Sequence, residues 1–570
     1  MEFMLNRKIL SVIFFIYSIN CFAQGTYIPL GSSSMHMIDR LEMLSGHIAT
    51  PAQFNTTTKA YQRSKIAEYA DQYDSLNLSK QDKFNLQYLR VDNFEFSKTT
   101  DCVSNKKIGK TGLYQKKSAL YAVNIPDFDL IINPVLYMRG EFDSKRNDRL
   151  PYFVDRGISI RGKIGKNFSF FTEVAEEIQS LNGWNLEYYN QYDVLPGQNF
   201  INTNTYKPND KYLFSYWNST GYIAYQAGKY FDVQFGHGKN FIGNGYRSLI
   251  LSDFSSPYTF LRLNTRIWRI NYTNIFGSLY NYEPLNITRT NIIKRHYFAT
   301  THASINITQK LNIGIFETTI FNRDSSFGTS GFDVQYLNPV IFYNAMDDVL
   351  NSPDKEILGI DFKYNFAKRY SLYGQFALSE LNFYNRIFKS GWWGNKEAIQ
   401  IGLKRIDLFN VSNLDLQLEY NQARPYSYTS YNPQNAFVNY NQSMMHPLGA
   451  NFMEGIAILR YQPTGKLFLN AKFIYSTYGN DSSGSNWGKN ISLSYFTRTQ
   501  QDFGNFIGQG VKTNLLITTF SASYMLKHNL FTDLQISYRK VTSNLAVFES
   551  EMFNIGVALR WNINMNECGY

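Results

Sequence analysis

The sequence predicts an all-β protein, a transmembrane antiparallel β-barrel of about 18 strands (roughly 16–20) with a small N-terminal periplasmic helical segment. Three observations lead to this fold class. Long segments alternate between apolar and polar residues, which places one set on each face of a strand. Aromatic residues make up 17% of the chain, yet its mean hydropathy is −0.33, which is typical of barrels with aromatic girdles and a polar lumen. The connections are alternately short and long.

The pattern of the first 23 residues is typical of a signal peptide. Two basic residues at 7–8 precede an apolar run at 9–19, and small residues lead up to Ala23. We expect cleavage after Ala23. The alternative is a lipoprotein anchored through Cys21, but Asn20 stands where such a signal needs a small residue.

Residues 24–117 are predicted to form a periplasmic helical region. Apolar residues recur at helical spacing at 38–44, 60–73 and 84–91, and Ser79 with Asp82 forms a capping pattern before the last of these. The three helices either pack as a separate unit or plug the mouth of the barrel. The sequence does not choose between these alternatives.

Residues 118–570 are predicted to form the barrel, because tight turns alternate with long loops. Tight turns are expected at 165–167, 309–310, 367–369, 463–466 and 527–529. Long polar connections are expected at 178–211, 239–259, 282–293, 381–395, 424–452, 477–487 and 500–511. Outer-membrane barrels sort their connections to opposite ends in this way. After the signal no apolar run reaches about 18 residues, so we expect strands to cross the membrane.

The segment from Phe553 to Asn566 is predicted to form the strand that closes the barrel. Its apolar residues alternate with small or polar ones, so one face meets lipid and the other meets the lumen. We expect it to run towards the periplasm and to pair with the strand near 128–142. Its Arg560 then faces the lumen, together with Asp361, Lys363, Asp533 and Arg539.

Two cysteines remain after the signal, Cys102 before the first candidate strand and Cys568 after the last. First and last strands are neighbours in a closed barrel, and both chain ends lie in the oxidising periplasm. A disulfide between these two cysteines is one interpretation. Two unrelated thiols are the other.

The net charge and the sequence motifs restrict the classes of partner and activity that we expect. The formal net charge of +11 favours anionic partners, such as outer-membrane lipid or acidic surface polysaccharide. No nucleic-acid motif is present. We expect neither an enzyme nor a bound cofactor or metal, because the metalloprotease and serine-hydrolase motifs are missing. The glycines at 236–245 match no phosphate-binding pattern, so we interpret them as structural.

Glycan binding fits the loops better than catalysis does. Aromatic faces and planar polar side chains hold sugars, and the loops supply both. The candidate glycan-binding residues are Arg247, Trp392, Trp393, Asn421, Arg424 and Tyr426. For Trp392 and Trp393 the alternative is the aromatic girdle at the membrane interface.

Several stretches resemble a known family. They are 27–46, 236–263, GFDVQYLNPVIFY at 331–343, GWWGNK at 391–396, EYNQARPY at 419–426 and HPLGAN at 446–451. Together they resemble the Wzi-like capsule-assembly barrels and, within them, the RemB branch of gliding motility proteins. The resemblance implies an 18-stranded barrel of the bacterial outer membrane and cell surface, with a periplasmic helical part and an outer face that binds or organises polysaccharide. A role in gliding motility is implied only by the RemB branch.

Two other functions remain open at this point. The barrel could be a porin-like channel for small solutes. It could also be an accessory that binds periplasmic or motility-complex proteins through its helical region.

Overall fold

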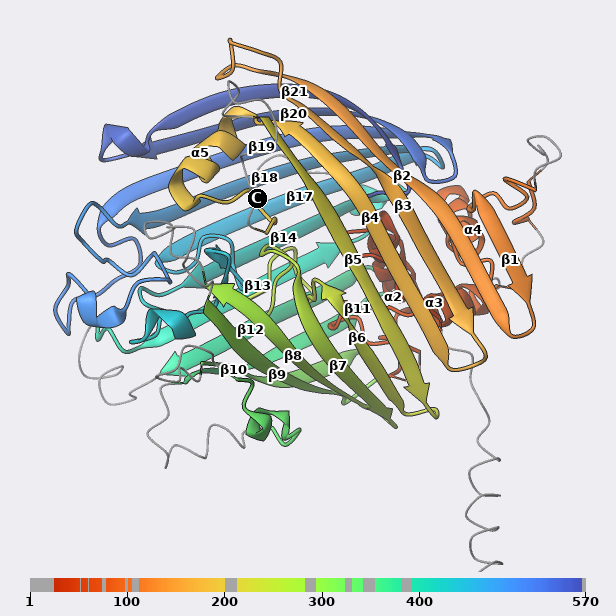
Figure 1. Ribbon diagram of the computed structural model, residues 1–570, viewed down its shortest axis with the longest axis horizontal. Helices are drawn as coiled ribbons and strands as arrows, with labels where there is room; N and C mark the ends of the chain where they lie inside the picture. Colours follow the sequence, from red (N-terminus) through yellow and green to blue (C-terminus); the bar gives the residue numbers. More distant parts are fainter. Residues whose placement is uncertain are drawn as a thin grey trace, which may run out of the picture.

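The computed structural model describes most of the chain downstream of the expected signal peptide, which itself lies outside the described residues. The described ranges are 25–51, 53–59, 61–73, 78–97, 101–104, 112–199, 213–281, 294–322, 331–341, 354–380 and 391–565. Within them the chain forms one large barrel with helices at one end and long loops at the other (Figure 1).

Eighteen antiparallel strands form the barrel wall within the described residues. A nineteenth strand of the same sheet, β1 (Tyr121–Ile125), pairs only with the first part of β2. The predicted fold class and strand number are therefore confirmed. The wall strands are β2 (Phe128–Asp143), β3 (Tyr152–Ile164), β4 (Phe168–Ser180), β5 (Leu213–Ala227), β6 (Phe231–Gly238), β7 (Tyr258–Ile267), β8 (Ile270–Asn281), β9 (Lys294–Asn306), β10 (Leu311–Phe321), β11 (Lys355–Phe366), β12 (Tyr370–Glu380), β13 (Lys396–Arg405), β14 (Leu414–Ala423), β17 (Phe452–Thr464), β18 (Leu467–Asn480), β19 (Val511–Lys527), β20 (Leu530–Ser543) and β21 (Ser550–Trp561).

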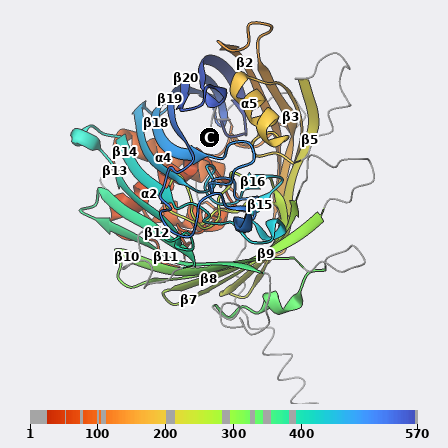
Figure 2. The ribbon, with the colours of Figure 1, turned by 90° about the vertical axis from the view of Figure 1, so that its left-hand side faces the viewer.

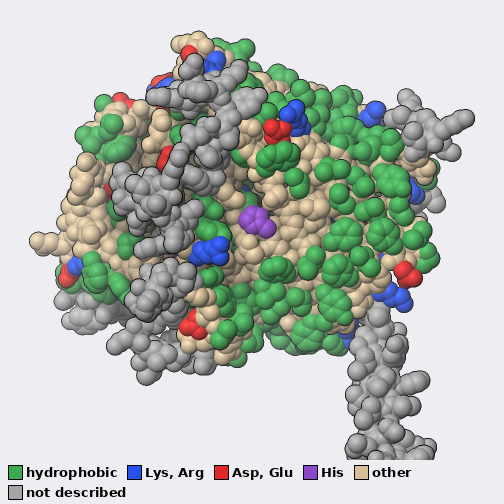
Figure 3. All heavy atoms as spheres, in the orientation of Figure 1, with side chains coloured by type: hydrophobic (Ala, Val, Ile, Leu, Met, Phe, Trp, Pro, Cys, Tyr) green, Lys and Arg blue, Asp and Glu red, His purple; other side chains and the backbone are tan. Residues whose placement is uncertain are grey.

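The two faces of the wall differ as the alternation predicts. Exposed apolar side chains cover the outside (Figure 3), among them Met138, Phe142, Ile158, Ile223, Phe235, Phe520, Phe553 and Val557. Buried polar and charged side chains cover the inside, among them Arg139, Glu141, Asp361, Lys363, Gln375, Asp415 and Asp533. An apolar outer band around a polar lumen is the surface that a membrane-spanning barrel requires.

The barrel closes between β2 and β21, as predicted, with Tyr137 opposite Arg560 and Asp143 opposite Asn554. The closing strand is shorter than expected, because it ends at Trp561 and not at Asn566. Asn562 has a φ of 54° and turns the chain out of the strand, and its side chain donates to the carbonyl of Pro134.

The five expected tight turns all lie between consecutive wall strands, at the end of the barrel that also holds the N-terminal helices. The described parts of the long connections lie at the other end (Figure 1), whereas 200–211, 282–293 and 381–390 lie outside the described residues. One expectation was wrong in detail: 477–487 and 500–511 belong to a single connection between β18 and β19, because 488–499 forms turns and a short helix, η7 (Tyr495–Thr497).

Three N-terminal helices fill the mouth of the barrel at the end that carries the tight turns (Figure 1). They are α2 (Ser33–Ser45), α3 (Arg63–Gln72) and α4 (Lys80–Asp92), and Ser79 caps α4 by accepting from the amide of Asp82, as predicted. Looking into the barrel from the loop end, the helices lie at the far end of the ring of strands (Figure 2). Of the two alternatives, the plug is the one that the structure adopts. No helix among the described residues is long and apolar enough to cross a membrane.

The outer half of the lumen is filled by loops. The β6–β7 loop contributes Ile242, Leu249, Ile250 and Leu251 to a buried apolar cluster, and the β14–β17 loop contributes residues between Ala436 and Ala450. The β14–β17 loop carries a small hairpin, β15 (Val438–Asn439) with β16 (Gln442–Ser443). The barrel is therefore packed at both ends, by helices below and by loops above.

Candidate functional site

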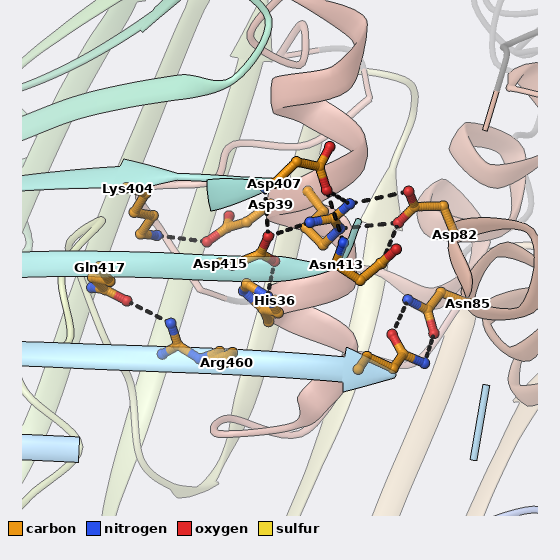
Figure 4. A network of polar contacts seen from close by, with 12 residues as sticks. His36, Asp39, Asp82, Asn85, Lys404, Asp407, Asn413, Asp415, Gln417 and Arg460 are labelled. Atoms are coloured by element: carbon orange, nitrogen blue, oxygen red, sulfur yellow. Dashed lines mark hydrogen bonds and ion pairs between the residues drawn. The ribbon is translucent and has the colours of Figure 1, made fainter. Parts of the chain in front are cut away.

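Helix α2 is bound to the wall by a buried charge network (Figure 4). The Arg40 guanidinium binds both oxygens of Asp82 on α4, each at 3.0 Å. It also lies 3.1 Å from Asp407 and forms an ion pair with Asp415 on β14. One plug residue thus joins a second plug helix to the wall through three carboxylates. Charge-assisted, bidentate contacts of this kind are among the stronger polar contacts in proteins.

Further contacts tie the plug to other strands. Lys404 Nζ on β13 lies 2.6 Å from Asp39 Oδ2, and Lys363 on β11 forms an ion pair with Glu42. Although burial raises the pKa of Asp39, the nearby lysines hold it well below its ordinary value. Asp39 therefore stays ionised at neutral pH, and the plug remains a charged partner of the wall.

A second buried network lies inside the barrel and holds the β6–β7 loop. Arg247 Nε lies 3.2 Å from Glu454 Oε1, and His446 Nε2 lies 2.8 Å from the same oxygen. The amide of Arg247 donates to Glu419 at 3.0 Å, and Asn421 donates to Glu419 at 2.9 Å. All five residues are buried, so the network anchors the loop.

This arrangement separates the six predicted glycan residues into two groups. Arg247 and Asn421 lie in the anchor network within the barrel. The other four come together at the outer end, where Arg424 Nε donates to the carbonyl of Asn395 at 2.8 Å and Trp393 packs edge-on against Tyr426 at 6.3 Å. Arg424 therefore holds the loop that carries Trp392 and Trp393.

The outer group is built around the ring of Trp393. Its centroid lies 5.1 Å from that of Tyr495, and the Arg498 guanidinium lies 4.5 Å above it. Lys396 Nζ lies 4.6 Å from the same ring. Trp393 is half-buried beneath these loop residues, which favours the loop interpretation over the girdle.

Exposed aromatic rings surround this group. Their exposed fractions are 40% for Tyr431, 70% for Phe496, 40% for Phe503 and 62% for Phe506. Arg498 and Asp502 lie among them as an ion pair at 2.5 Å. Phe496, Arg498, Asp502, Phe503 and Phe506 belong to the β18–β19 loop and were not among the glycan-binding residues predicted from the sequence. The signal was present in the run from Tyr495 to Gln509, where rings recur among polar residues.

Comparisons with known proteins point to one fold. No protein-family model matches the sequence, and no curated protein matches it. Among solved structures, Wzi from Escherichia coli superposes with a TM-score of 0.56 over 95% of this chain and 100% of that chain, at 10% identity. Wzi is an outer membrane protein involved in group 1 capsule assembly and a carbohydrate-binding β-barrel.

The chain has the fold of Wzi.

Two weaker likenesses are OprD from Pseudomonas aeruginosa and OccAB1 from Acinetobacter baumannii. OprD has a TM-score of 0.40 at 10% identity, over 76% of this chain and 94% of that chain. OccAB1 has a TM-score of 0.39 at 11% identity, over 75% of this chain and 96% of that chain.

The chain therefore has the fold of an antiparallel β-barrel with N-terminal helices. Three or more metal-binding side chains do not come together anywhere in the described ranges. Of the two cysteines, Cys102 is buried, and Cys568 lies outside the described residues, so their pairing stays a prediction.

Proposed function

We propose that the chain is an outer-membrane barrel that binds surface polysaccharide at its outer end and helps to organise it as a capsule or a related coat. The observation that carries this proposal is the group of exposed rings at Tyr431, Phe496, Phe503 and Phe506, with an ion pair among them. Exposed apolar patches bordered by polar groups mark binding sites. Flat rings beside planar charged groups suit the alternating apolar and hydroxyl faces of sugars.

Two further observations support a binding protein over a channel. The lumen is filled by the plug and by the apolar cluster of the inward loops, whereas a porin keeps an aqueous path. The fold is also that of Wzi, a carbohydrate-binding barrel involved in capsule assembly. Within this proposal Trp392, Trp393, Arg424 and Tyr426 shape the binding surface, while Arg247 and Asn421 fix the loops beneath it.

Retention of polysaccharide on cells tests the proposal. The double substitution Phe496→Ser and Phe506→Ser should release polysaccharide to the medium without lowering the amount of folded barrel. Phe409→Ser is the matched control, because Phe409 is 77% exposed but lies in the turn between β13 and β14, at the opposite end. Unchanged retention in the double variant, or equal loss in the control, would argue against an outer glycan surface.

We infer in addition a role in gliding motility, within a complex that has periplasmic or cell-surface protein partners. Only the resemblance of the quoted segments to the RemB branch supports this role. Cells of a gliding host that lack the protein should glide more slowly, and the wild-type gene should restore their speed. Normal gliding without the protein would remove this role and leave the glycan proposal intact.

A further inference from the structure

A large cavity remains between the plug and the inward loops. Its volume is about 740 Å³, which is within the usual range for small-ligand sites. Helix α2 and Lys59 border it on the plug side, the β6–β7 loop and residues 195–198 border it on the outer side, and wall strands complete it. None of the roles described so far uses this space.

The cavity wall carries far more positive than negative side chains. Among the described residues, nine Lys and Arg side chains line it, against four Asp and Glu. Five of the nine bind carboxylates, namely Arg40, Arg139, Arg247, Lys404 and Arg560. Lys59 and Lys239, by contrast, form no ion pair with any described residue. Both side chains are half-buried and border the cavity, and charges that are removed from water are normally paired, so these two lysines call for an explanation.

The backbone holds these two lysines on neighbouring segments. The plug segment at Thr58 pairs with Ile242 of the β6–β7 loop, and the amide of Lys59 donates to the carbonyl of Phe241 at 3.1 Å. Lys239 precedes Phe241 by two positions, and its Nζ lies next to Gly197, where an added Cβ would come within 3.1 Å of it. The plug segment that carries Lys59 and the loop that carries Lys239 thus meet at the cavity.

Neither ammonium group has a carboxylate of a described residue within ion-pair distance, although Asp253 acts on both from farther away. Burial lowers the pKa of Lys59 to about 8 and also lowers the pKa of Lys239. The carboxylates that act on them from a distance are Asp39, which is bound to Lys404, Asp253, and Glu177 on β4, which is bound to neutral donors. A bound anion would oppose the cost of burial and favour the charged lysines.

The rest of the lining suits a sugar better than a simple ion. Amide and hydroxyl groups at Gln417, Asn470, Ser521 and Ser523 face the same space, and they can exchange hydrogen bonds with sugar hydroxyls. Rings of Phe241, Trp184 and Tyr246 provide flat apolar faces. An inorganic anion would fill only a small part of the volume.

We propose that this cavity binds an acidic oligosaccharide, with a carboxylate of the sugar held between Lys59 and Lys239. The inference rests on the proposed glycan function and deepens it by naming an internal subsite and the charge of its ligand. The outer rings would then make the first contact with the chain of sugars, and the cavity would select its acidic units.

Calorimetry on the full-length barrel in detergent tests the subsite. The probes are a trimer of galacturonic acid and its methyl ester, which keeps the sugar backbone but replaces each charged carboxylate with a neutral, slightly larger ester. The acid should bind, and the ester should bind at least tenfold more weakly, since contacts to charged groups contribute roughly that factor or more. Lys59→Met and Lys239→Met should each weaken binding of the acid to a similar extent. Lys59→Arg and Lys239→Arg, which keep the charge, should retain most of it.

Lys166→Met is the matched control, because Lys166 is exposed in the turn between β3 and β4 and should leave binding unchanged. Equal binding of acid and ester, or wild-type binding by both Met variants, would overturn the acidic subsite while glycan binding stands. The acidic subsite would also be overturned if the purified wild-type protein bound polysaccharide but did not bind the trimer. If wild type binds neither trimer nor polysaccharide, the proposed function falls together with the subsite.

Discussion

The Arg40 guanidinium of helix α2 and the Asp415 carboxylate of strand β14 form a buried ion pair between the plug and the barrel wall. The same guanidinium binds Asp82 and Asp407, so three carboxylates share one cation. His36 Nε2 adds a further contact to Asp415 at 2.9 Å. Since the mutual attraction of buried charges must offset the loss of their hydration, the position of the plug depends strongly on this one arginine.

Arg40→Met is expected to loosen the plug. It removes the cation from three carboxylates, two of which are almost fully buried, and breaking a buried pair from one side costs about 3–5 kcal/mol. The variant should unfold at a lower temperature in detergent and show larger open currents than wild type in planar bilayers. Lys540→Met, which removes an exposed pair with Glu551, should change neither measurement. Wild-type currents and stability in Arg40→Met would contradict a plug held by this network.

Arg247→Met is expected to free the β6–β7 loop from its anchor. The substitution leaves Glu454 buried without its guanidinium partner, again at a cost of about 3–5 kcal/mol. Adding Glu454→Gln removes the unpaired carboxylate, so the double variant should recover part of the lost stability. The difference between the stability change of the double variant and the sum of the two single changes measures the coupling of the pair. Protease cleavage within 239–257 measures the release of the loop, and the unfolding temperature measures the loss of stability. Additive losses would show that the two side chains act independently.

The sequence predicts the wall better than it predicts the interior. Alternation is a local property of a strand, so the faces of the segment around Phe553 to Trp561 could be assigned without knowing its neighbours. Its end could not be assigned, because the alternation continues beyond Asn562 while the left-handed turn there depends on a contact with Pro134.

The interior depends on contacts between distant segments. Helical spacing identifies the apolar face of α2, but nothing local indicates that Arg40 meets Asp415, which lies 375 positions away. Likewise a basic residue in a polar loop has the same sequence context whether it faces solvent or the lumen. For that reason Arg247 was grouped with Arg424 as a glycan contact, although Arg247 is buried in an anchor network and Arg424 lies at the outer end.

Stability is expected to fall between pH 7 and pH 5, in part through His446. Burial lowers the pKa of this histidine, although Glu454 opposes the effect, and its Nδ1 accepts from the amide of Leu448 at 3.2 Å, as a neutral ring does. Below about pH 6.5 the unfolded chain therefore binds more protons than the folded one, and acid favours unfolding. Asp39 adds nothing in this window, because its depressed pKa matters only at much lower pH.

His446→Gln should flatten this pH dependence, because the amide can still donate to Glu454 but cannot take up a proton. Unfolding temperatures in detergent between pH 5 and pH 7.5 give the comparison. Some dependence should remain in the variant, since burial also lowers the pKa of His36 in the plug. An equal slope in wild type and variant would show that His446 is not responsible.

Cys102 and Cys568 are expected to form a disulfide in protein isolated from the outer membrane. Val103 pairs with Lys116 beside Cys102, and the ring of Tyr114 in the same segment stacks on Trp561 at 5.9 Å, so this segment lies at the end of β21. The seven residues from Trp561 to Cys568 can span up to roughly 24 Å. In unfolded protein kept without reductant, neither thiol should react with iodoacetamide, whereas both should react after reduction. In Cys568→Ser, Cys102 should react without reductant and the barrel should lose about 2–4 kcal/mol of stability. Full alkylation of unreduced wild type would rule the bond out.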